Sequence, residues 1–305
     1  MVESAIHGER DQSSAPVRIN LHLQQLAYVR ELERADTLTE AAHRLQVSQS
    51  ALSQSLSELE RRLGTPLIER DGRQRRFTEA GREVARFATD VLGRAAELEN
   101  WLEAYREGES GTLRIGMIDA ASLYVLPRAI SEFRTTHPGV QLRLVVETSG
   151  ELIRRLRRFE LDLAFVVGPP GADLDARELL REPLYVYGPP GASGRPADAS
   201  WVLYPAGSQT RNVIDLGLSG LGISPRVVLE SHNPEVLRQM VALGLGWSVL
   251  PSAVAEAGDF PLVAAGGGAP VAERVLLAVR RRSEWEDARV TAFLHLAEAA
   301  IAGWE

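Results

Sequence analysis

The chain has 305 residues, of which 45% are hydrophobic and 25% charged, and its formal net charge is −7 at pH 7. This length indicates about two domains rather than one small module. The sequence has no cysteine, which excludes disulfide frameworks and thiolate metal sites and agrees with a reducing cytoplasm. No apolar run approaches the roughly 20 residues of a membrane span, and the polar residues 1–17 lack a signal core. We therefore expect a disordered N-terminal extension and a protein that is not exported.

Three short helices are predicted near the N-terminus, the last two joined by a tight turn. The expected helices are at about 19–33, 39–45 and 49–63. Apolar residues at steps of three and four place one face of each helix in a core, and the small Ala41 and Ala42 allow close packing. We expect Thr39 or Asp36 to cap the second helix and Ser48 to cap the third.

The face of the third helix opposite its apolar stripe carries uncharged, hydrogen-bonding side chains. They are Gln49, Ser50, Ser53, Gln54 and Ser57. Amides and hydroxyls suit a helix in the DNA major groove, where they reach base edges and phosphates. The alternative is a helical hairpin whose second helix is serine-rich and simply solvated.

An arginine-rich β-hairpin, or wing, is predicted directly after these helices. Residues 67–70 and 75–78 form its strands, and Asp71-Gly72 is a hairpin-turn dipeptide. Between residues 61 and 86, eight arginines stand against four carboxylates, so a basic patch lies within an acidic protein. Arginines beside a reading helix supply phosphate contacts. The DNA-binding candidates are therefore Thr39, Ser48, Gln49, Ser50, Ser53, Gln54, Ser57, Arg70, Arg73, Arg75 and Arg76.

A family resemblance is carried by the run LTEAAHRLQVSQSALSQSLSELERRLGTPLIERDGRQRRFTEAG. It resembles the winged helix-turn-helix of the LysR-type transcriptional regulators, and the match spans about residues 21–87. The family often has proline where this chain has Ser50 and a basic residue where it has Gln54. Both departures leave the base preference open. The resemblance implies a bacterial transcription regulator with an all-α winged helix-turn-helix domain at about 18–78.

A long linker helix is predicted at about residues 79–106. Its apolar residues alternate in steps of four and three, which is a heptad seam. They are Val84, Ala88, Val91, Ala95, Leu98, Leu102 and Tyr105. So narrow a seam indicates pairing with the same helix of a second subunit, and packing on its own domain is the alternative. A homodimer, or a dimer of dimers, would present paired heads to an inverted-repeat operator.

Strand and helix patterns alternate from residue 112 onward, the signature of an α/β sheet with parallel strands. The strands are expected at 112–118, 140–147, 163–167, 184–188, 201–204, 226–230, 247–250 and 274–280, and the helices at 124–136, 151–159, 213–218, 234–243 and 284–301. This layout resembles the LysR effector-binding region, an α/β, periplasmic-binding-protein-like domain of two lobes, here at 112–305. The resemblance implies a multidomain chain that crosses between lobes near Leu184 and Val275. Lobe I would be about 112–184 with 275–305, and lobe II about 185–274.

Polar side chains follow several strands of this predicted region. Ligands bind at the carboxyl ends of such strands, near helix N-termini, so these loops would line an effector cleft. The effector-binding candidates are Asp119, Ser122, Thr148, Ser149, Ser208, Gln209, Thr210, His232, Asn233 and Trp247. Simple helix capping is the alternative for Ser122, Asn233 and the Thr148-Ser149 pair. If Asp119 faces the cleft, its carboxylate repels an anionic effector and favours an amine or a neutral one.

The sequence shows no recognisable catalytic arrangement. The six histidines lack metal-ligand spacing, a G-x-x-x-x-G-K loop cannot form without lysine, and Gly246-Trp247-Ser248 lacks the second glycine of a nucleophile elbow. We therefore expect no enzyme, no cofactor and no metal site. The expected function is sequence-specific transcription regulation in the cytoplasm under an unidentified small-molecule effector, with promoter DNA and RNA polymerase as partners. The alternatives are a small-molecule sensor with a degenerate DNA-binding head and an architectural DNA-binding protein without a ligand.

Overall fold

The computed structural model describes residues 21–71, 74–107, 110–192, 195–257, 261–265, 268–283 and 286–302, so the expected disorder of residues 1–17 lies outside the described part. The chain divides into two compact units, Met1–Ala95 and Ala96–Glu305. Among the described helices, none combines the length and the apolar character needed to cross a membrane.

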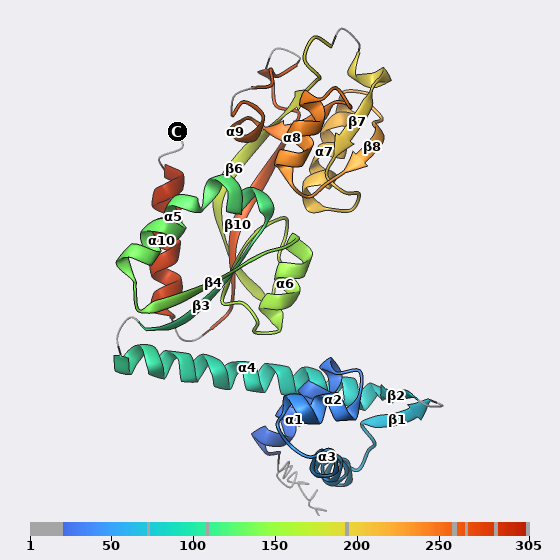
Figure 1. Ribbon diagram of the computed structural model, residues 1–305, viewed down its shortest axis with the longest axis vertical. Helices are drawn as coiled ribbons and strands as arrows, with labels where there is room; N and C mark the ends of the chain where they lie inside the picture. Colours follow the sequence, from blue (N-terminus) through green and yellow to red (C-terminus); the bar gives the residue numbers. More distant parts are fainter. Residues whose placement is uncertain are drawn as a thin grey trace, which may run out of the picture. The chain divides into compact units, whose positions relative to one another are not determined.

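The first unit is the predicted winged helix-turn-helix, called the head below. It contains α1 (Leu23–Arg34), α2 (Leu38–Arg44), α3 (Gln49–Leu63) and the antiparallel hairpin of β1 (Ile68–Asp71) and β2 (Gln74–Phe77) (Figure 1). α3 has its predicted bounds because both of its ends are specified locally. The Ser48 hydroxyl accepts a hydrogen bond from the Ala51 N–H at 3.1 Å, and Gly64 ends the helix with a positive φ of 69°.

The N-cap of α2 is Thr37, so the prediction of Thr39 or Asp36 is wrong. The Thr37 hydroxyl accepts from the Glu40 N–H at 3.1 Å, and the Glu40 carboxylate accepts from the Asp36 N–H at 3.0 Å. This reciprocal pair resembles a capping box and satisfies N–H groups that have no partner inside the helix. The helix therefore begins one residue earlier than expected, and Thr39 lies within its first turn.

The long helix α4 (Glu79–Glu107) is anchored to the head at its first turn. The Thr78 hydroxyl accepts a hydrogen bond from the Gly81 N–H at 2.9 Å. A Cβ atom at Gly81 would lie 2.0 Å from the Leu67 carbonyl oxygen, so only glycine fits at this approach. The first turn of α4 thus packs tightly against Leu67 and Phe77 at the base of the wing, which fixes the start of the helix.

The predicted apolar seam of α4 is buried near the start of the helix and exposed farther along it. Ala88 is buried, so this part of the seam is used for packing within the unit. Farther along, Leu98, Trp101 and Leu102 are exposed by 38%, 36% and 43%. The Tyr105 side chain lies outside the described part. Pairing of this helix with a second copy stays a prediction.

The second unit contains a six-stranded sheet with the order β4-β3-β5-β10-β6-β9 and a two-stranded sheet of β7 and β8. The strands are β3 (Gly111–Met117), β4 (Val140–Val146), β5 (Leu163–Val167), β6 (Leu174–Tyr187), β7 (Ser200–Leu203), β8 (Arg226–Glu230), β9 (Ser248–Pro251) and β10 (Ala272–Arg281). The larger sheet is mixed, whereas parallel strands were predicted. β3 is parallel to β4 and β5, but β10 is antiparallel to β5 and β6, and β6 to β9.

The antiparallel strands arise from the two passages of the chain between lobes. β6 leads from lobe I to lobe II and β10 returns beside it, so the two must run in opposite directions (Figure 1). β6 begins ten residues before its predicted start at Leu184. Its first part, LDARELLREP, is rich in charge and lacks apolar alternation, and it is a strand because β10 pairs with it.

The helices of this unit cover the sheets. They are α5 (Pro127–Thr136), preceded by a π-helix (Ala121–Val125), α6 (Ser149–Arg157), a 3-10 turn (Pro196–Asp198), α7 (Gln209–Gly220), α8 (Pro234–Ala242), α9 (Ser252–Ala255) and α10 (Ala288–Ala302). α7 is longer than the predicted 213–218 because the Ser208 hydroxyl caps it, accepting from the Arg211 N–H at 3.2 Å.

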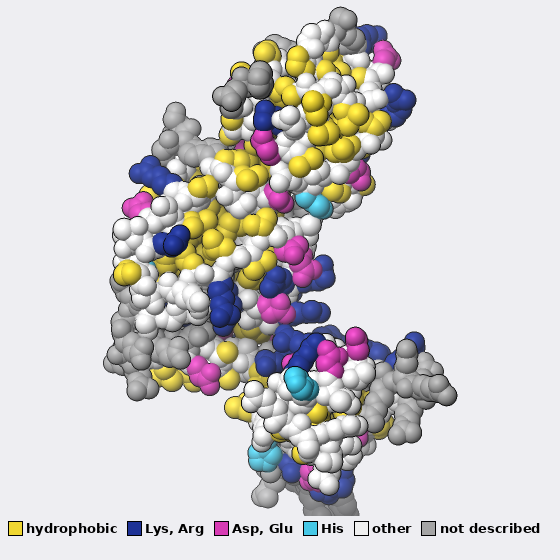
Figure 2. All heavy atoms as spheres, in the orientation of Figure 1, with side chains coloured by type: hydrophobic (Ala, Val, Ile, Leu, Met, Phe, Trp, Pro, Cys, Tyr) yellow, Lys and Arg dark blue, Asp and Glu magenta, His cyan; other side chains and the backbone are white. Residues whose placement is uncertain are grey.

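Each lobe has its own buried core. The core of lobe I uses residues between 113 and 180 and between 276 and 301, including Phe133, Phe165 and Phe293. The core of lobe II uses residues between 184 and 272, around Trp201 and Leu237. Large apolar side chains also remain exposed on lobe II, and Figure 2 shows such atoms gathered on one face of it. Among the most exposed are Leu216, Leu221, Leu243 and Val263.

Candidate functional site

The polar face of α3 points outward. Leu52, Leu56 and Leu59 on its other face are buried in the head core. The five predicted reading residues are exposed or half-buried: Gln49, Ser50, Ser53, Gln54 and Ser57. The helix therefore offers amides and hydroxyls to an external partner and keeps its apolar stripe inside, which is the arrangement required of a major-groove helix.

The N-terminal end of α3 is held beside α2 and the wing. The Thr39 hydroxyl donates to Gln49 Oε1 at 3.3 Å, and the Ser48 and Ser50 hydroxyl oxygens lie 3.0 Å apart. Thr39, Gln49 and Arg76 all line one hollow of about 740 Å³ on the head. Five predicted DNA-binding residues, from α2, α3 and β2, thus lie around the tip of the reading helix.

The arginines of the wing are placed by the hairpin register. Arg70 lies opposite Arg75, and Glu69 lies opposite Arg76. The Arg76 side chain is exposed, whereas the side chains of Arg70 and Arg75 and the whole of Arg73 lie outside the described residues. At the end of α3, Arg61 and Arg62 are ion-paired with Glu58 at 2.7 and 2.8 Å, so their charges are partly balanced.

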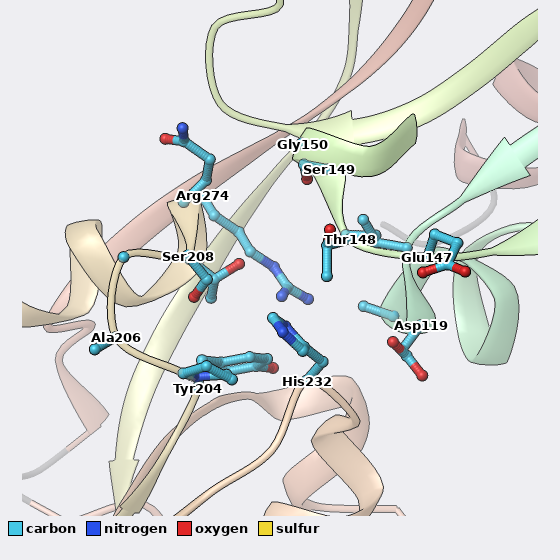
Figure 3. Close-up of a pocket in the computed structure, with 16 residues that line it drawn as sticks. Asp119, Glu147, Thr148, Ser149, Gly150, Tyr204, Ala206, Ser208, His232 and Arg274 are labelled. Atoms are coloured by element: carbon cyan, nitrogen blue, oxygen red, sulfur yellow. The ribbon is translucent and has the colours of Figure 1, made fainter. Parts of the chain in front are cut away.

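A pocket of about 350 Å³ lies between the two lobes of the second unit (Figure 3). Seven of the ten predicted effector-binding residues line it: Asp119, Thr148, Ser149, Ser208, Gln209, Thr210 and His232. They come from four loops, after β3, β4, β7 and β8. The carboxyl ends of these strands therefore converge at one place, as expected for open α/β sheets.

The other three predicted residues lie outside this lining. The Ser122 hydroxyl donates to the Asp119 carbonyl oxygen at 2.8 Å. The Asn233 side chain accepts from the Glu235 N–H at 2.9 Å, so it caps α8. Trp247 is buried in the core of lobe II, with its ring centroid 6.5 Å from that of Trp201. Ser122 and Asn233 are polar because each makes a local hydrogen bond beside a helix. Trp247 packs in the core of lobe II.

Two helix N-termini open into the pocket. The Thr148 hydroxyl caps α6 by accepting from the Glu151 N–H at 3.4 Å, and the Ser208 hydroxyl caps α7. The Ser149 hydroxyl accepts from the Val167 N–H at 3.1 Å and is thereby tied to β5. Each helix start carries a partial positive charge and N–H groups without intrahelical partners. The pocket is therefore favourable to an anionic group at these two walls.

Sequence reasoning missed the residue at the back of the pocket, Arg274. It is 3% exposed and donates from Nε to Glu182 at 2.6 Å, from Nη2 to the Tyr124 hydroxyl, and its guanidinium carbon lies 6.0 Å from the Tyr204 ring centroid. Figure 3 shows the guanidinium directed toward the middle of the pocket. The only hint in the sequence was a charged residue next to the apolar run VLLAV. A buried cation thus lies within reach of a bound ligand.

Two tyrosines complete this charged cluster. Burial raises the pKa of Tyr124 and of Tyr204, so both hydroxyls keep their protons at neutral pH. The Tyr204 hydroxyl is buried and has no hydrogen-bond partner among the described residues. Since an unsatisfied buried donor is costly, a ligand atom that accepts from it would be stabilising.

Two carboxylates stand on the opposite side of the pocket. Asp119 and Glu147 line it and lie across from the Arg274 guanidinium in Figure 3. Within the described part of the chain, neither side chain has an ion-pair partner. The pocket is thus positive at the back and negative at the rim.

Comparisons with known proteins agree with these two regions. Residues 23–82 match the family model of the bacterial regulatory helix-turn-helix protein, lysR family, and residues 106–302 match that of the LysR substrate binding domain. The chain is 31% identical over 242 residues to the RuBisCO operon transcriptional regulator of Allochromatium vinosum, covering 76% of this chain and 80% of that protein.

Two solved structures have a similar fold over nearly the whole chain. Full-length OxyR from Pseudomonas aeruginosa is 27% identical with a TM-score of 0.66, covering 92% of this chain and 97% of that chain. Full-length CbnR in complex with its target DNA is 21% identical with a TM-score of 0.64, covering 92% of this chain and 100% of that chain. The second likeness concerns the fold alone.

Proposed function

The chain belongs to the LysR family of bacterial DNA-binding transcriptional regulators with an effector-binding domain, and we propose that it reads an inverted-repeat operator as a dimer or a dimer of dimers. The observation that carries the proposal is the outward, uncharged face of α3 opposite its buried leucines. In this proposal Gln49, Ser50, Ser53 and Gln54 contact base edges. Backbone contacts come from Thr39, Ser48, Ser57, Arg70, Arg73, Arg75 and Arg76.

The proposed dimer uses the exposed stretch of α4. Leu98, Trp101 and Leu102 lie at steps of three and one and present apolar surface to solvent in a single copy of the chain. Linking two heads raises the affinity for two half-sites by effective concentration. RNA polymerase is proposed as a further partner, acting in the cytoplasm where promoter DNA is found.

The proposed control site is the pocket between the lobes. Its effector contacts Asp119, Thr148, Ser149, Ser208, Gln209, Thr210 and His232 from the predicted set, and Arg274, Tyr204 and Glu147 besides. A ligand there touches both lobes, so it can favour one relative lobe position over another. A nearly complete switch needs about 5.5 kcal/mol of differential affinity. We propose binding and release, without a catalysed reaction.

The decisive experiment is a mobility-shift titration of the purified full chain on the DNA upstream of its own gene. A scrambled fragment of equal length is the matched control, and the salt concentration is varied for both. The proposal requires tighter binding to the upstream fragment and an affinity that falls steeply with salt. Equal binding to both fragments, or no binding at low salt, would leave a small-molecule sensor with a degenerate head as the better description.

A further inference from the structure

The pocket between the lobes has two ends of opposite charge, and a ligand that fills it meets both. At the back lie the Arg274 guanidinium, the Tyr204 hydroxyl and the starts of α6 and α7. At the rim lie the Asp119 and Glu147 carboxylates (Figure 3). We propose that the effector is an amino acid or a close zwitterionic relative, bound with its carboxylate at the back and its ammonium group at the rim. This inference rests on the proposed role of the pocket as the control site.

The back of the pocket is suited to a carboxylate. Glu182 accepts a hydrogen bond from Nε of Arg274, and the Tyr124 hydroxyl accepts one from Nη2. No described residue accepts from Nη1, so the Nη1 N–H groups can donate to a ligand in the pocket. The Tyr204 hydroxyl is 4% exposed and keeps its proton, with no acceptor among the described groups. A carboxylate accepts from both at once, and the starts of α6 and α7 favour its negative charge.

The rim argues against a ligand that is only an anion. Glu182 offsets part of the positive charge of Arg274, so the back of the pocket alone does not balance the charge of a bound anion. A simple anion would also approach two carboxylates, Asp119 and Glu147, for which the described residues provide no ion-pair partner. An ammonium group on the same ligand removes this repulsion and supplies the missing partner.

The volume of the pocket also suits a ligand of the size of an amino acid. Its volume of about 350 Å³ is near the lower end of the range of roughly 300–1,000 Å³ typical of small-molecule sites. Ile118, Pro205 and Ala206 add apolar surface beside the charged groups, which would accommodate the side chain of the ligand. Discrimination between amino acids would depend on this apolar part.

The test is a thermal-shift screen of the full chain against the twenty protein amino acids at millimolar concentration. Each amino acid that binds is compared with the amine that lacks its carboxylate and with the 2-hydroxy acid that lacks its amino group. We expect at least one amino acid to raise the melting temperature and both analogues to bind about tenfold more weakly or worse. Binding of the amine or the hydroxy acid as tightly as the amino acid, or no shift with any of the twenty, would overturn the proposal.

Two variants test the carboxylate-binding end and the ammonium-binding end of the pocket separately. Tyr204→Phe should weaken the amino acid and the hydroxy acid alike and leave the amine unchanged, with Tyr185→Phe as the matched control outside the pocket. Asp119→Asn should weaken the amino acid but not the hydroxy acid, with Asp198→Asn as its control. A mobility shift without any effector is run in parallel. Intact operator binding together with a negative screen would refute the ligand class and leave the regulator function standing.

Discussion

Arg274 and Glu182 lie opposite each other on β10 and β6, and their side chains form a buried ion pair with 2.6 Å between Nε and Oε2. These are the two strands by which the chain passes between the lobes. Arg274 also bonds to Tyr124 from lobe I and lies over the ring of Tyr204 from lobe II. A ligand that contacts Arg274 therefore acts at the joint between the lobes, where its contacts can favour one relative lobe position over another.

Removal of the cation from this pair should strongly destabilise the second unit. Arg274→Met leaves Glu182 as an unpaired buried carboxylate, and we expect a loss of about 3–5 kcal/mol in the free energy of unfolding. The double variant Arg274→Met with Glu182→Leu should recover most of this loss, because no charge is then buried. Urea unfolding of the full chain followed by tryptophan emission measures both, since Trp201 and Trp247 lie in the lobe II core. A double variant no more stable than the single one would contradict this explanation.

Ser48 allows the stability of α3 to be separated from DNA binding. Its hydroxyl caps α3 and is exposed at the tip of the reading helix. Ser48→Ala should cost about 1 kcal/mol, whereas Ser48→Asp keeps the cap and the stability. The aspartate should nevertheless abolish operator binding, because its charge would face phosphates. Thermal unfolding and mobility shifts test the pair, and Ser131→Asp on α5 adds the same charge elsewhere as a control. Tight operator binding by Ser48→Asp would show that α3 does not enter the groove as proposed.

Elements with local signals were predicted well from the sequence. α3, β5 and β8 have their predicted bounds, and in α3 the cap at Ser48 and the glycine at Gly64 explain why. The loops around the pocket were also predicted, because helix starts after strands carry recognisable capping residues. Seven of ten predicted residues line it. Of the other three, Ser122 donates to a backbone carbonyl oxygen, Asn233 caps α8 and Trp247 packs in the core of lobe II.

What the sequence could not indicate depends on residues far apart in the chain. Arg274 lies 92 residues from Glu182 and 150 from Tyr124. No periodicity distinguishes it from the other arginines, and its role appears only when three elements meet. The first half of β6 was missed for the same reason, because β10 makes it a strand. Because the pairing of β6 with β10 was missed, the sheet was predicted to be parallel, whereas it is mixed.

Gln54 should decide which operator sequence is preferred. It is exposed on the polar face of α3, and a glutamine amide can bond to a base edge. Gln54→Ala should cost about 1–3 kcal/mol on the preferred operator and much less on operators altered at the contacted base pair. Binding to a panel of single-base operator variants measures this difference.

The contrast to Gln54→Ala is Arg76→Ala in the wing. A phosphate contact carries no base information, so this variant should weaken all operators alike and lower the salt slope by about one. If Gln54→Ala also weakened every operator equally, its proposed base contact would be refuted, and the departure from the family pattern at this position would have no effect on preference.

The exposed stretch of α4 should hold the dimer together. Leu98 and Leu102 are 38% and 43% exposed in a single copy, which is unfavourable for two large apolar side chains on one helix unless a partner covers them. A variant with both Leu98→Asp and Leu102→Asp should sediment as a monomer, while Glu99→Gln on the same stretch leaves the dimer intact. Operator affinity should fall by about 10²–10⁴, because the second head no longer gains from effective concentration. A double variant that still sediments as a dimer would place the subunit contact on another surface, for which the exposed leucines of lobe II are the next candidates.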